Sequence, residues 1–134
     1  MNQRRNSSFQ LTPITGIIGI CFLVFVVTFI APQTRGVLAM TPATLAQEPW
    51  TIVTSIFTHS GWWHLFFNMF ATFFFGSYLM RFVGERKTLL IFLAGGLLGN
   101  VFFLLYTLLP GVSPFISVVG ASGGVFALGG ALAV

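Results

Sequence analysis

The chain has 134 residues, of which 56% are hydrophobic and only 6% are charged, whereas soluble domains carry about a quarter charged residues. This composition excludes an ordinary water-soluble globular protein and predicts an integral membrane protein. Six Lys and Arg residues against two acids give a formal net charge of +4, but the cations are scattered and form no basic stripe of the kind that binds nucleic acid.

The first predicted element is a cytoplasmic tail over residues 1–13, which is polar and contains Arg4 and Arg5. Residues 14–31 follow as 18 positions without a charge, close to the ~20 residues that cross a bilayer core as a helix. A cleaved signal peptide is the competing interpretation, because positive residues precede the apolar run. We favour a first span, since the run is longer than the apolar core of a signal and Ala31-Pro32-Gln33 is a poor cleavage site.

A long loop is predicted over residues 32–61. Within it, residues 41–44 resemble the start of a helix, and residues 50–57 are half apolar. A stretch of that length and amphipathic character is expected to lie in the membrane interface rather than to cross the bilayer.

Three further apolar segments complete the predicted fold. The second span covers residues 62–80. No charged residue occurs from position 88 to position 134, a length too great for one span and sufficient for two. The prolines and glycine of residues 110–114 break this stretch, so that a third span covers residues 89–109 and a fourth begins near Ser122. The expected fold is an all-α membrane bundle.

The distribution of positive charge predicts the orientation. A polar connection after the second span contains Arg81, Arg86 and Lys87. With the N-terminus in the cytoplasm, these three cations and the two arginines of the tail lie inside, and Arg35 lies outside. Five cations against one agree with the positive-inside rule, and the inverted topology is rejected. The loops before the second and fourth apolar segments then face outwards.

The last apolar segment is short. Residues 122–134 give ~20 Å of helix at ~1.5 Å per residue, against a bilayer core of ~30 Å. The segment has no polar flank or basic anchor, and its last carbonyls would be unsatisfied in lipid. We therefore expect the sequence to be a fragment of a longer chain, truncated within its fourth span.

Polar side chains within spans are costly and require an explanation. His64 and Asn68 lie four positions apart on one face of the second span, near its outer end. Ser122 lies between glycines at the outer end of the fourth segment. A structural interpretation remains open for each: an interhelical hydrogen bond for the first pair, and close helix packing for the small residues, whose spacing Gly95 and Gly99 repeat.

A chemical interpretation combines the same residues. A serine at a helix N-terminus exposes its hydroxyl beside free backbone N–H groups, and a nearby histidine and asparagine can donate to a developing oxyanion. A general base for the serine is missing from this set. His59 precedes the second span and is expected to be an interfacial polar residue. Glu85 is expected on the cytoplasmic side, where it pairs with a cation or caps a helix.

A metal site is not predicted. The spacing of five residues does not place His59 and His64 on one helical face, and no carboxylate lies near them. Cys21 is the only cysteine, which excludes an internal disulfide and a multi-cysteine metal site.

From Pro49 to the C-terminus the sequence resembles the rhomboid family of intramembrane serine proteases. The blocks that carry the resemblance are Trp50, Phe57-Thr58-His59-Ser60-Gly61-Trp62-Trp63-His64-Leu65-Phe66-Phe67-Asn68, Gly84-Glu85-Arg86 and Gly120-Ala121-Ser122-Gly123-Gly124. A glycine–serine–glycine motif alone is weakly specific, whereas a histidine–asparagine pair placed one span before it is a strong signal.

The resemblance implies a six-helix bundle, of which residues 14–134 supply the first four spans. It implies that Ser122 is the nucleophile and that His64 and Asn68, with the Ser122 backbone N–H, form the oxyanion hole. Glu85 matches an acidic residue that holds cytoplasmic helix ends together. Supporting positions around the site are His59, Gly120, Gly123 and Phe126.

The sequence departs from the family pattern in three places. Thr51 follows Trp50 where the family has an arginine, and Phe126 stands where a tyrosine often stacks on the catalytic histidine. The family's general base is a histidine on the sixth helix, and no residue of this chain matches it. The 134 residues alone are therefore expected to be inactive.

The resulting hypothesis is an intramembrane serine endopeptidase that hydrolyses peptide bonds in or near transmembrane segments of membrane proteins. It implies the lipid bilayer and transmembrane substrates as partners, a plasma-membrane location with the site towards the outer face, no nucleic acid and no cofactor. The alternative is a non-catalytic rhomboid-like protein that binds transmembrane clients. A channel or packing subunit ranks last, because polar residues occur at one depth only.

Overall fold

The computed structural model describes residues 11–134, so that the expected cytoplasmic tail over residues 1–13 lies almost entirely outside the described residues. The described chain is helical and contains one isolated β-bridge. Its elements are α1 (Pro13–Ile30), α2 (Thr34–Leu38), the 3₁₀ turn η1 (Pro42–Thr44), α3 (Thr51–Phe57), α4 (Trp62–Val83), α5 (Glu85–Tyr106) and α6 (Ser122–Leu132).

Three of these helices, α1, α4 and α5, are long and apolar enough to cross a membrane. They match the three predicted spans to within a few residues, and the prediction of an all-α membrane bundle is confirmed. The helix α6 has 11 residues, about 16 Å at ~1.5 Å per residue, which is shorter than a ~30 Å bilayer core. The short helix α2 was not predicted, because its sequence Thr-Arg-Gly-Val-Leu has no clear helical pattern.

Local sequence explains where the long helices begin and end. Thr12 and Thr15 form a capping box at the start of α1, and Pro13 occupies its first turn. A single residue, Gly84, joins α4 to α5 with a φ of 82°. Glycine adopts this left-handed conformation without a steric penalty, which allows two spans to follow each other directly.

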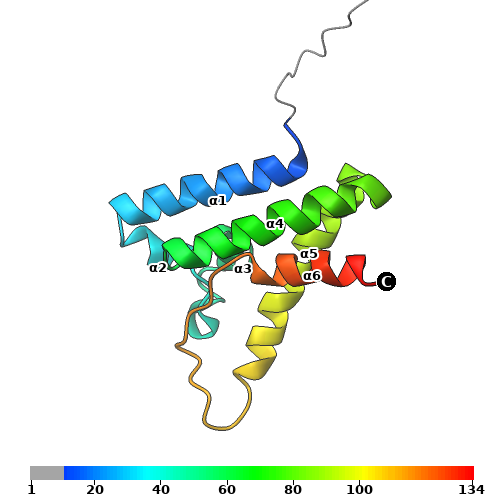
Figure 1. Cartoon of the computed structure of the whole chain (residues 1–134). Coiled ribbons are helices and arrows are strands. Elements are labelled where there is room, and N and C mark those ends of the chain that lie inside the picture. Colours follow the sequence, from blue (N-terminus) through cyan, green and yellow to red (C-terminus); the bar gives the residue numbers. More distant parts are fainter. Residues whose placement is uncertain (1–10) are drawn as a thin grey trace, which may run out of the picture.

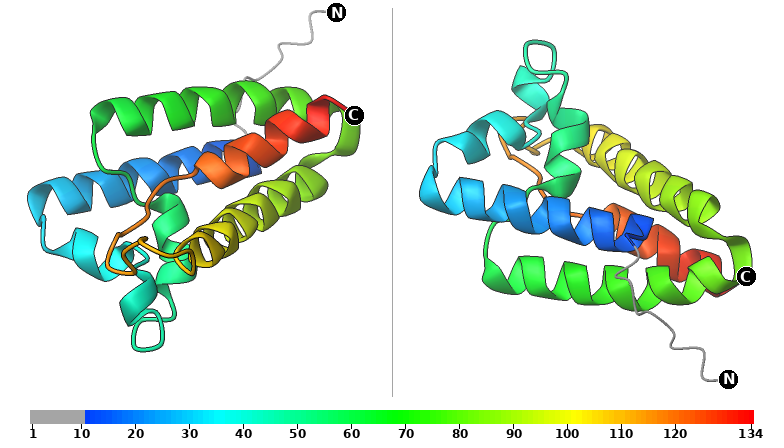
Figure 2. Two further views of the ribbon diagram at one scale, coloured as in Figure 1. Left: turned by 90° about the horizontal axis from the view of Figure 1, so that it is seen from below. Right: turned by 90° about the horizontal axis from the view of Figure 1, so that it is seen from above.

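The helices form a bundle in which α6 lies between α4 and α5 (Figures 1 and 2). The helix α1 packs along α4 and runs in the opposite direction, whereas α4 and α6 run in the same direction (Figure 2). The starts of α4 and α6 therefore lie towards the same side of the bundle, together with the short helices of the 31–61 loop. Buried apolar side chains from every long helix form the core: Ile14, Ile17, Cys21, Phe25, Leu65, Leu79, Phe92 and Leu128.

Small residues allow α5 and α6 to approach closely. A Cβ at Gly95 would lie 2.7 Å from the carbonyl oxygen of Gly123, and one at Gly99 would lie 3.3 Å from the Cα of Gly123. Gly124 packs on the ring and backbone of Phe92 in the same way. Because lipid gives no hydrophobic drive between helices, such close backbone contact is a main source of association. The packing interpretation of the glycine stripe is confirmed for Gly95, Gly99 and Gly123.

Hydrogen bonds join the two long loops at the end where α4 and α6 begin. Met40 and Val118 exchange backbone hydrogen bonds of 3.1 and 2.9 Å, and the hydroxyls of Thr41 and Ser117 lie 2.7 Å apart. These contacts fix the segment that leads into α6, and with it the position of Ser122.

Candidate active site

Ser122 is the first residue of α6, and its side chain is exposed. The first N–H groups of a helix have no acceptor within the helix, so the backbone around Ser122 can donate to an anion. Ser122 lines a cavity of about 250 Å³ together with Gly120, Gly123 and Phe126, whereas His64 and Asn68 are not among its lining residues. The Phe126 ring is 80% exposed. All four of these predicted site residues therefore line one cavity.

Gly120 is the point at which α4 meets the start of α6. Its φ is 121°, and a Cβ at this position would lie 2.6 Å from Nε2 of His64. Any larger residue would therefore be strained in its backbone and would collide with the imidazole. The structure thus brings His64 directly against the Gly120–Ser122 segment, as the family resemblance implies.

The His64 ring is held from several sides. Its Nδ1 lies 3.0 Å from the hydroxyl of Ser60 and accepts the Ser60 backbone N–H at 3.4 Å. The ring of His59 packs edge-on against it, with ring centroids 5.1 Å apart. Nε2, the nitrogen opposite these contacts, is left facing Gly120.

Asn68 lies one turn further along α4 and is 9% exposed. Its Nδ2 donates to the backbone carbonyl of His64 at 2.8 Å, which is a bond within the same helix rather than the interhelical bond of the structural interpretation. An amide nitrogen carries two hydrogens, so one donor remains for another acceptor. The bond to His64 joins the Asn68 side chain to the helical turn that carries the imidazole.

His59, expected to be an interfacial polar residue, is fully buried within the protein. It lies in the short non-helical segment between α3 and α4. Helical spacing therefore does not apply to this residue, and its ring packs against that of His64. Burial and the neighbouring His64 lower the pKa of His59 to about 4. Neither ring nitrogen has a hydrogen-bond partner among the described residues, so the ring is neutral near pH 7.

Two polar residues near the site were not predicted. Asn100 of α5 donates to the carbonyl of Ile52 at 2.7 Å and to the hydroxyl of Ser55 at 2.9 Å. Ser55 in turn accepts the backbone N–H of Gly120 at 2.8 Å through its carbonyl. The chain Asn100–Ser55–Gly120 therefore connects the third span to the serine segment. The sequence feature that could have identified Asn100 is a single carboxamide within an otherwise uncharged span.

The remaining predicted residues have structural positions. Glu85 is exposed in the first turn of α5, where a carboxylate is favoured by the helix dipole. Trp50 donates its indole N–H to the carbonyl of Val37 at 2.9 Å, and Thr51 donates its hydroxyl to the carbonyl of Glu48 at 2.7 Å. Across residues 11–134, no group of three or more His, Cys, Asp or Glu side chains forms a ligand set for a metal.

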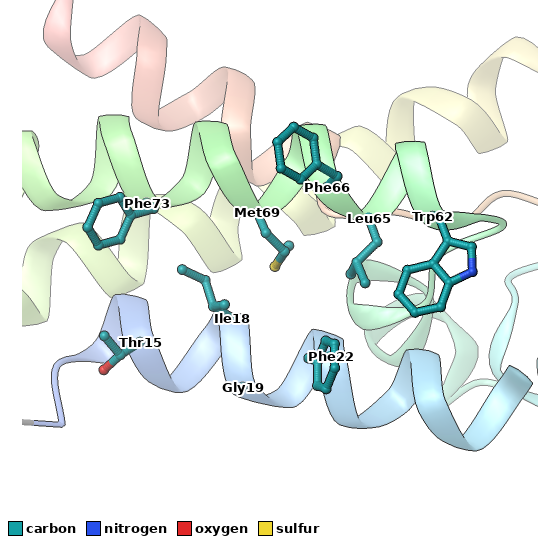
Figure 3. Close-up of a pocket in the computed structure, with 9 residues that line it drawn as sticks. All are labelled: Thr15, Ile18, Gly19, Phe22, Trp62, Leu65, Phe66, Met69 and Phe73. Carbon is teal, nitrogen blue, oxygen red and sulfur yellow. The ribbon is translucent and has the colours of Figure 1, made fainter.

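A larger cavity lies elsewhere in the described part of the chain. A groove of about 590 Å³ separates α1 from α4 and is lined by Thr15, Ile18, Gly19, Phe22, Trp62, Leu65, Phe66, Met69 and Phe73 (Figure 3). Apolar side chains dominate this lining, and it includes no acid, base or strong nucleophile. The candidate active site is therefore assigned to Ser122 and its surroundings, because Ser122 and Asn100 line the smaller cavity and His64 lies against Gly120 beside it.

A family domain shared with known proteins covers the part of the chain that contains this site. The family model described as Rhomboid domain matches residues 46–134, which include every candidate site residue. The chain is 36% identical to the Bacillus subtilis (strain 168) rhomboid-family relative YdcA over 83 residues, and 38% identical to the rhomboid protease GluP of the same organism over 85 residues. It is also 32% identical over 90 residues to Inactive RHOMBOID-like protein 8 of Arabidopsis thaliana.

These alignments cover 62%, 63% and 64% of this chain, respectively. They cover 39%, 15% and 26% of the three relatives. The chain therefore spans well under half the length of the relatives that it matches. Its similarity extends both to a protease and to a protein named as inactive, so family membership by itself leaves the activity to be argued from the site.

Proposed function

The chain belongs to the rhomboid family, and on that premise we propose that it is part of an intramembrane serine protease that hydrolyses peptide bonds in or near transmembrane segments of other membrane proteins. The observation that carries the proposal is the position of His64, whose Nε2 lies against Gly120, two residues before the exposed hydroxyl of Ser122. This contact supports the proposal, because it brings an imidazole beside the backbone that leads into an accessible serine at the start of a helix.

In the proposed reaction, the Ser122 hydroxyl attacks the carbonyl carbon of the substrate peptide bond. Electrons move to the carbonyl oxygen, and the resulting oxyanion accepts hydrogen bonds from His64 Nε2, the free Asn68 amide hydrogen and the Ser122 backbone N–H. The tetrahedral intermediate then collapses: the C–N bond breaks, the base gives the proton taken from Ser122 to the leaving amine, and the first product departs. Water, deprotonated by the same base, attacks the remaining acyl-enzyme, the ester bond to Ser122 breaks, and the second product leaves as a carboxylic acid while Ser122 regains its proton. The substrate helix must unwind locally to present its carbonyl, so small or helix-destabilising residues at the cleaved bond are favoured.

The attack also requires a base that takes the serine proton. We assign this role to neither histidine of the chain, because Nδ1 of His64 is directed at Ser60 and His59 is buried beneath it. The proposal therefore needs a histidine supplied from outside these 134 residues. It also places the protein in the plasma membrane, with an inside N-terminus and the site towards the outer face.

The test is cleavage of a transmembrane reporter substrate, co-expressed with the protein at the length at which its own cell makes it. Ser122→Ala is expected to abolish cleavage, and His64→Ala to lower kcat by roughly a hundred- to a thousandfold, as for other oxyanion donors. Ser77→Ala is the matched control, since Ser77 lies further along α4 in a groove with Phe74 and Arg81. It should cleave like the wild type.

The non-catalytic alternative is favoured by the similarity to Inactive RHOMBOID-like protein 8. It predicts that the reporter is bound but not cut, and that Ser122→Ala binds the reporter as the wild type does. Reporter capture without cleavage by the wild-type protein would therefore decide for the alternative.

A further inference from the structure

Ser60 is a loop residue two positions before the first residue of α4, and the proposed reaction does not use it. It is nevertheless the residue that contacts Nδ1 of His64, through its hydroxyl at 3.0 Å and its backbone N–H at 3.4 Å. Both contacts reach the same ring nitrogen, on the side of the ring away from Gly120. The residue is therefore in a position to decide which nitrogen of His64 carries the proton.

The backbone N–H of Ser60 shows whether Nδ1 of His64 donates or accepts, which the contact with the hydroxyl alone leaves undetermined. A hydroxyl can donate or accept, but an amide N–H can only donate, so Nδ1 must act as an acceptor in this arrangement. A neutral imidazole carries one proton, and that proton is then on Nε2. The hydroxyl of Ser60 donates to Nδ1 as well, because Nδ1 has no hydrogen to offer.

We propose that Ser60 is a positioning residue that fixes His64 in the tautomer whose Nε2 carries the proton and faces the Gly120–Ser122 segment. This inference rests on the proposed role of His64 as an oxyanion donor. In the opposite tautomer the Nε2 lone pair would face the developing negative charge, and the donor would become a repulsive group. Ser60 thus acts on the reaction through His64 and does not touch the substrate.

The experiment measures tautomer and kinetics on the same protein. Imidazole ¹⁵N NMR of the full-length wild-type protein is expected to show His64 protonated at Nε2, with its signals assigned by their loss in His64→Gln. In Ser60→Ala a fraction protonated at Nδ1 is expected to appear. The same variant should lose about three- to tenfold in kcat, the effect of one ordinary hydrogen bond, with KM changed less than twofold.

Ser60→Thr keeps a hydroxyl and is expected to restore both the tautomer and kcat. A merely structural role for Ser60 would lower thermal stability and leave the tautomer of the remaining folded protein unchanged. An unchanged tautomer in Ser60→Ala, or a wild-type His64 protonated at Nδ1, overturns the inference. Because NMR reads the tautomer without catalysis, this failure is distinct from that of the proposed function, which persistent cleavage by Ser122→Ala would reveal.

Discussion

At the scale of single residues, the geometry of the site depends on residues that leave space for a neighbouring side chain or restrict its position. Gly120 has no side chain, and His64 occupies the space that a Cβ would fill. Ser60 and His59 restrict the same imidazole from the other side. The contact between His64 and the segment that leads into Ser122 thus depends on residues to which the proposed reaction assigns no chemical step, and conservative changes at these residues should have large effects.

Gly120→Ala is expected to lower kcat at least tenfold and to reduce stability by about 1–3 kcal/mol, because it adds a strained φ and a collision with His64. The measurement is reporter cleavage together with the thermal unfolding midpoint in detergent. Gly111→Ala is the matched control, since Gly111 also has a positive φ, of 84°, and no atom lies within 4 Å of its Cβ position. Equal losses of activity in the two variants would assign the effect to backbone strain alone.

His59 gives the protein a stability that depends on pH. Its pKa is lowered from 6.5 to about 4 in the folded chain. Between these two pH values the unfolded chain binds a proton that the folded chain does not, so stability is full above about pH 6.5 and falls as the pH drops towards 4. Thermal unfolding across this range should show the decline. In His59→Gln the slope should become smaller, and an unchanged slope would contradict the assignment.

At the scale of elements, the contact between α5 and α6 determines the depth and angle of the serine helix. Its closest points are glycines, and backbone lies directly against backbone at Gly95 and Gly123. The Asn100 side chain adds a polar connection from α5 to α3 near the same end. The serine helix is therefore fixed against the third span along its length, rather than only at its first residue.

Gly95→Ala is expected to destabilise the protein by about 1–3 kcal/mol, since the new Cβ overlaps α6 and forces the two helices apart. The measurement is the thermal unfolding midpoint in detergent. Gly130→Ala is the control on α6, because no atom lies within 4 Å of its Cβ position. The control should be neutral or slightly stabilising, as expected for alanine in place of glycine in a helix. A neutral Gly95→Ala would show that the close contact is not needed.

At the scale of the whole molecule, the direction of the helices and the distribution of positive charge are consistent with one orientation in the membrane. The helices α4 and α6 run in the same direction (Figure 2), and their starts are joined to the two long loops. Arg81, Arg86 and Lys87 lie at the opposite end, around the single-residue turn at Gly84. The positive-inside rule predicts that these cations lie in the cytoplasm and that the start of α6 lies towards the outside.

Cysteine labelling in intact cells tests this orientation. Cys21, the single cysteine of the 134 residues, is fully buried and should not react with the label. A membrane-impermeant maleimide is expected to label Ser113→Cys, which lies in the exposed loop before α6, and not Lys87→Cys, which is exposed in the first turn of α5. Permeabilised cells provide the control, in which both variants should react. Labelling of Lys87→Cys alone in intact cells would show that the topology is the inverse of the one predicted.

The sequence by itself determined the membrane class and the three spans, and it predicted that His64 and Ser122 lie at the same end of the bundle. Length, hydropathy and charge are local properties, and the bilayer converts them directly into spans and orientation. The family resemblance added the expected roles, including that of Ser122. These are the features for which each residue can be interpreted with little knowledge of its neighbours in space.

Only the tertiary structure decided the rest. Helical spacing does not apply to His59 and His64, because His59 lies in the short non-helical connection between α3 and α4, where the two rings pack together and His59 is buried. Ser60, Ser55 and Asn100 acquired their positions in the same way, from contacts between loops and helices. Such contacts depend on which segments of the chain pack together in the folded protein. The pattern of residues along the sequence does not specify those contacts.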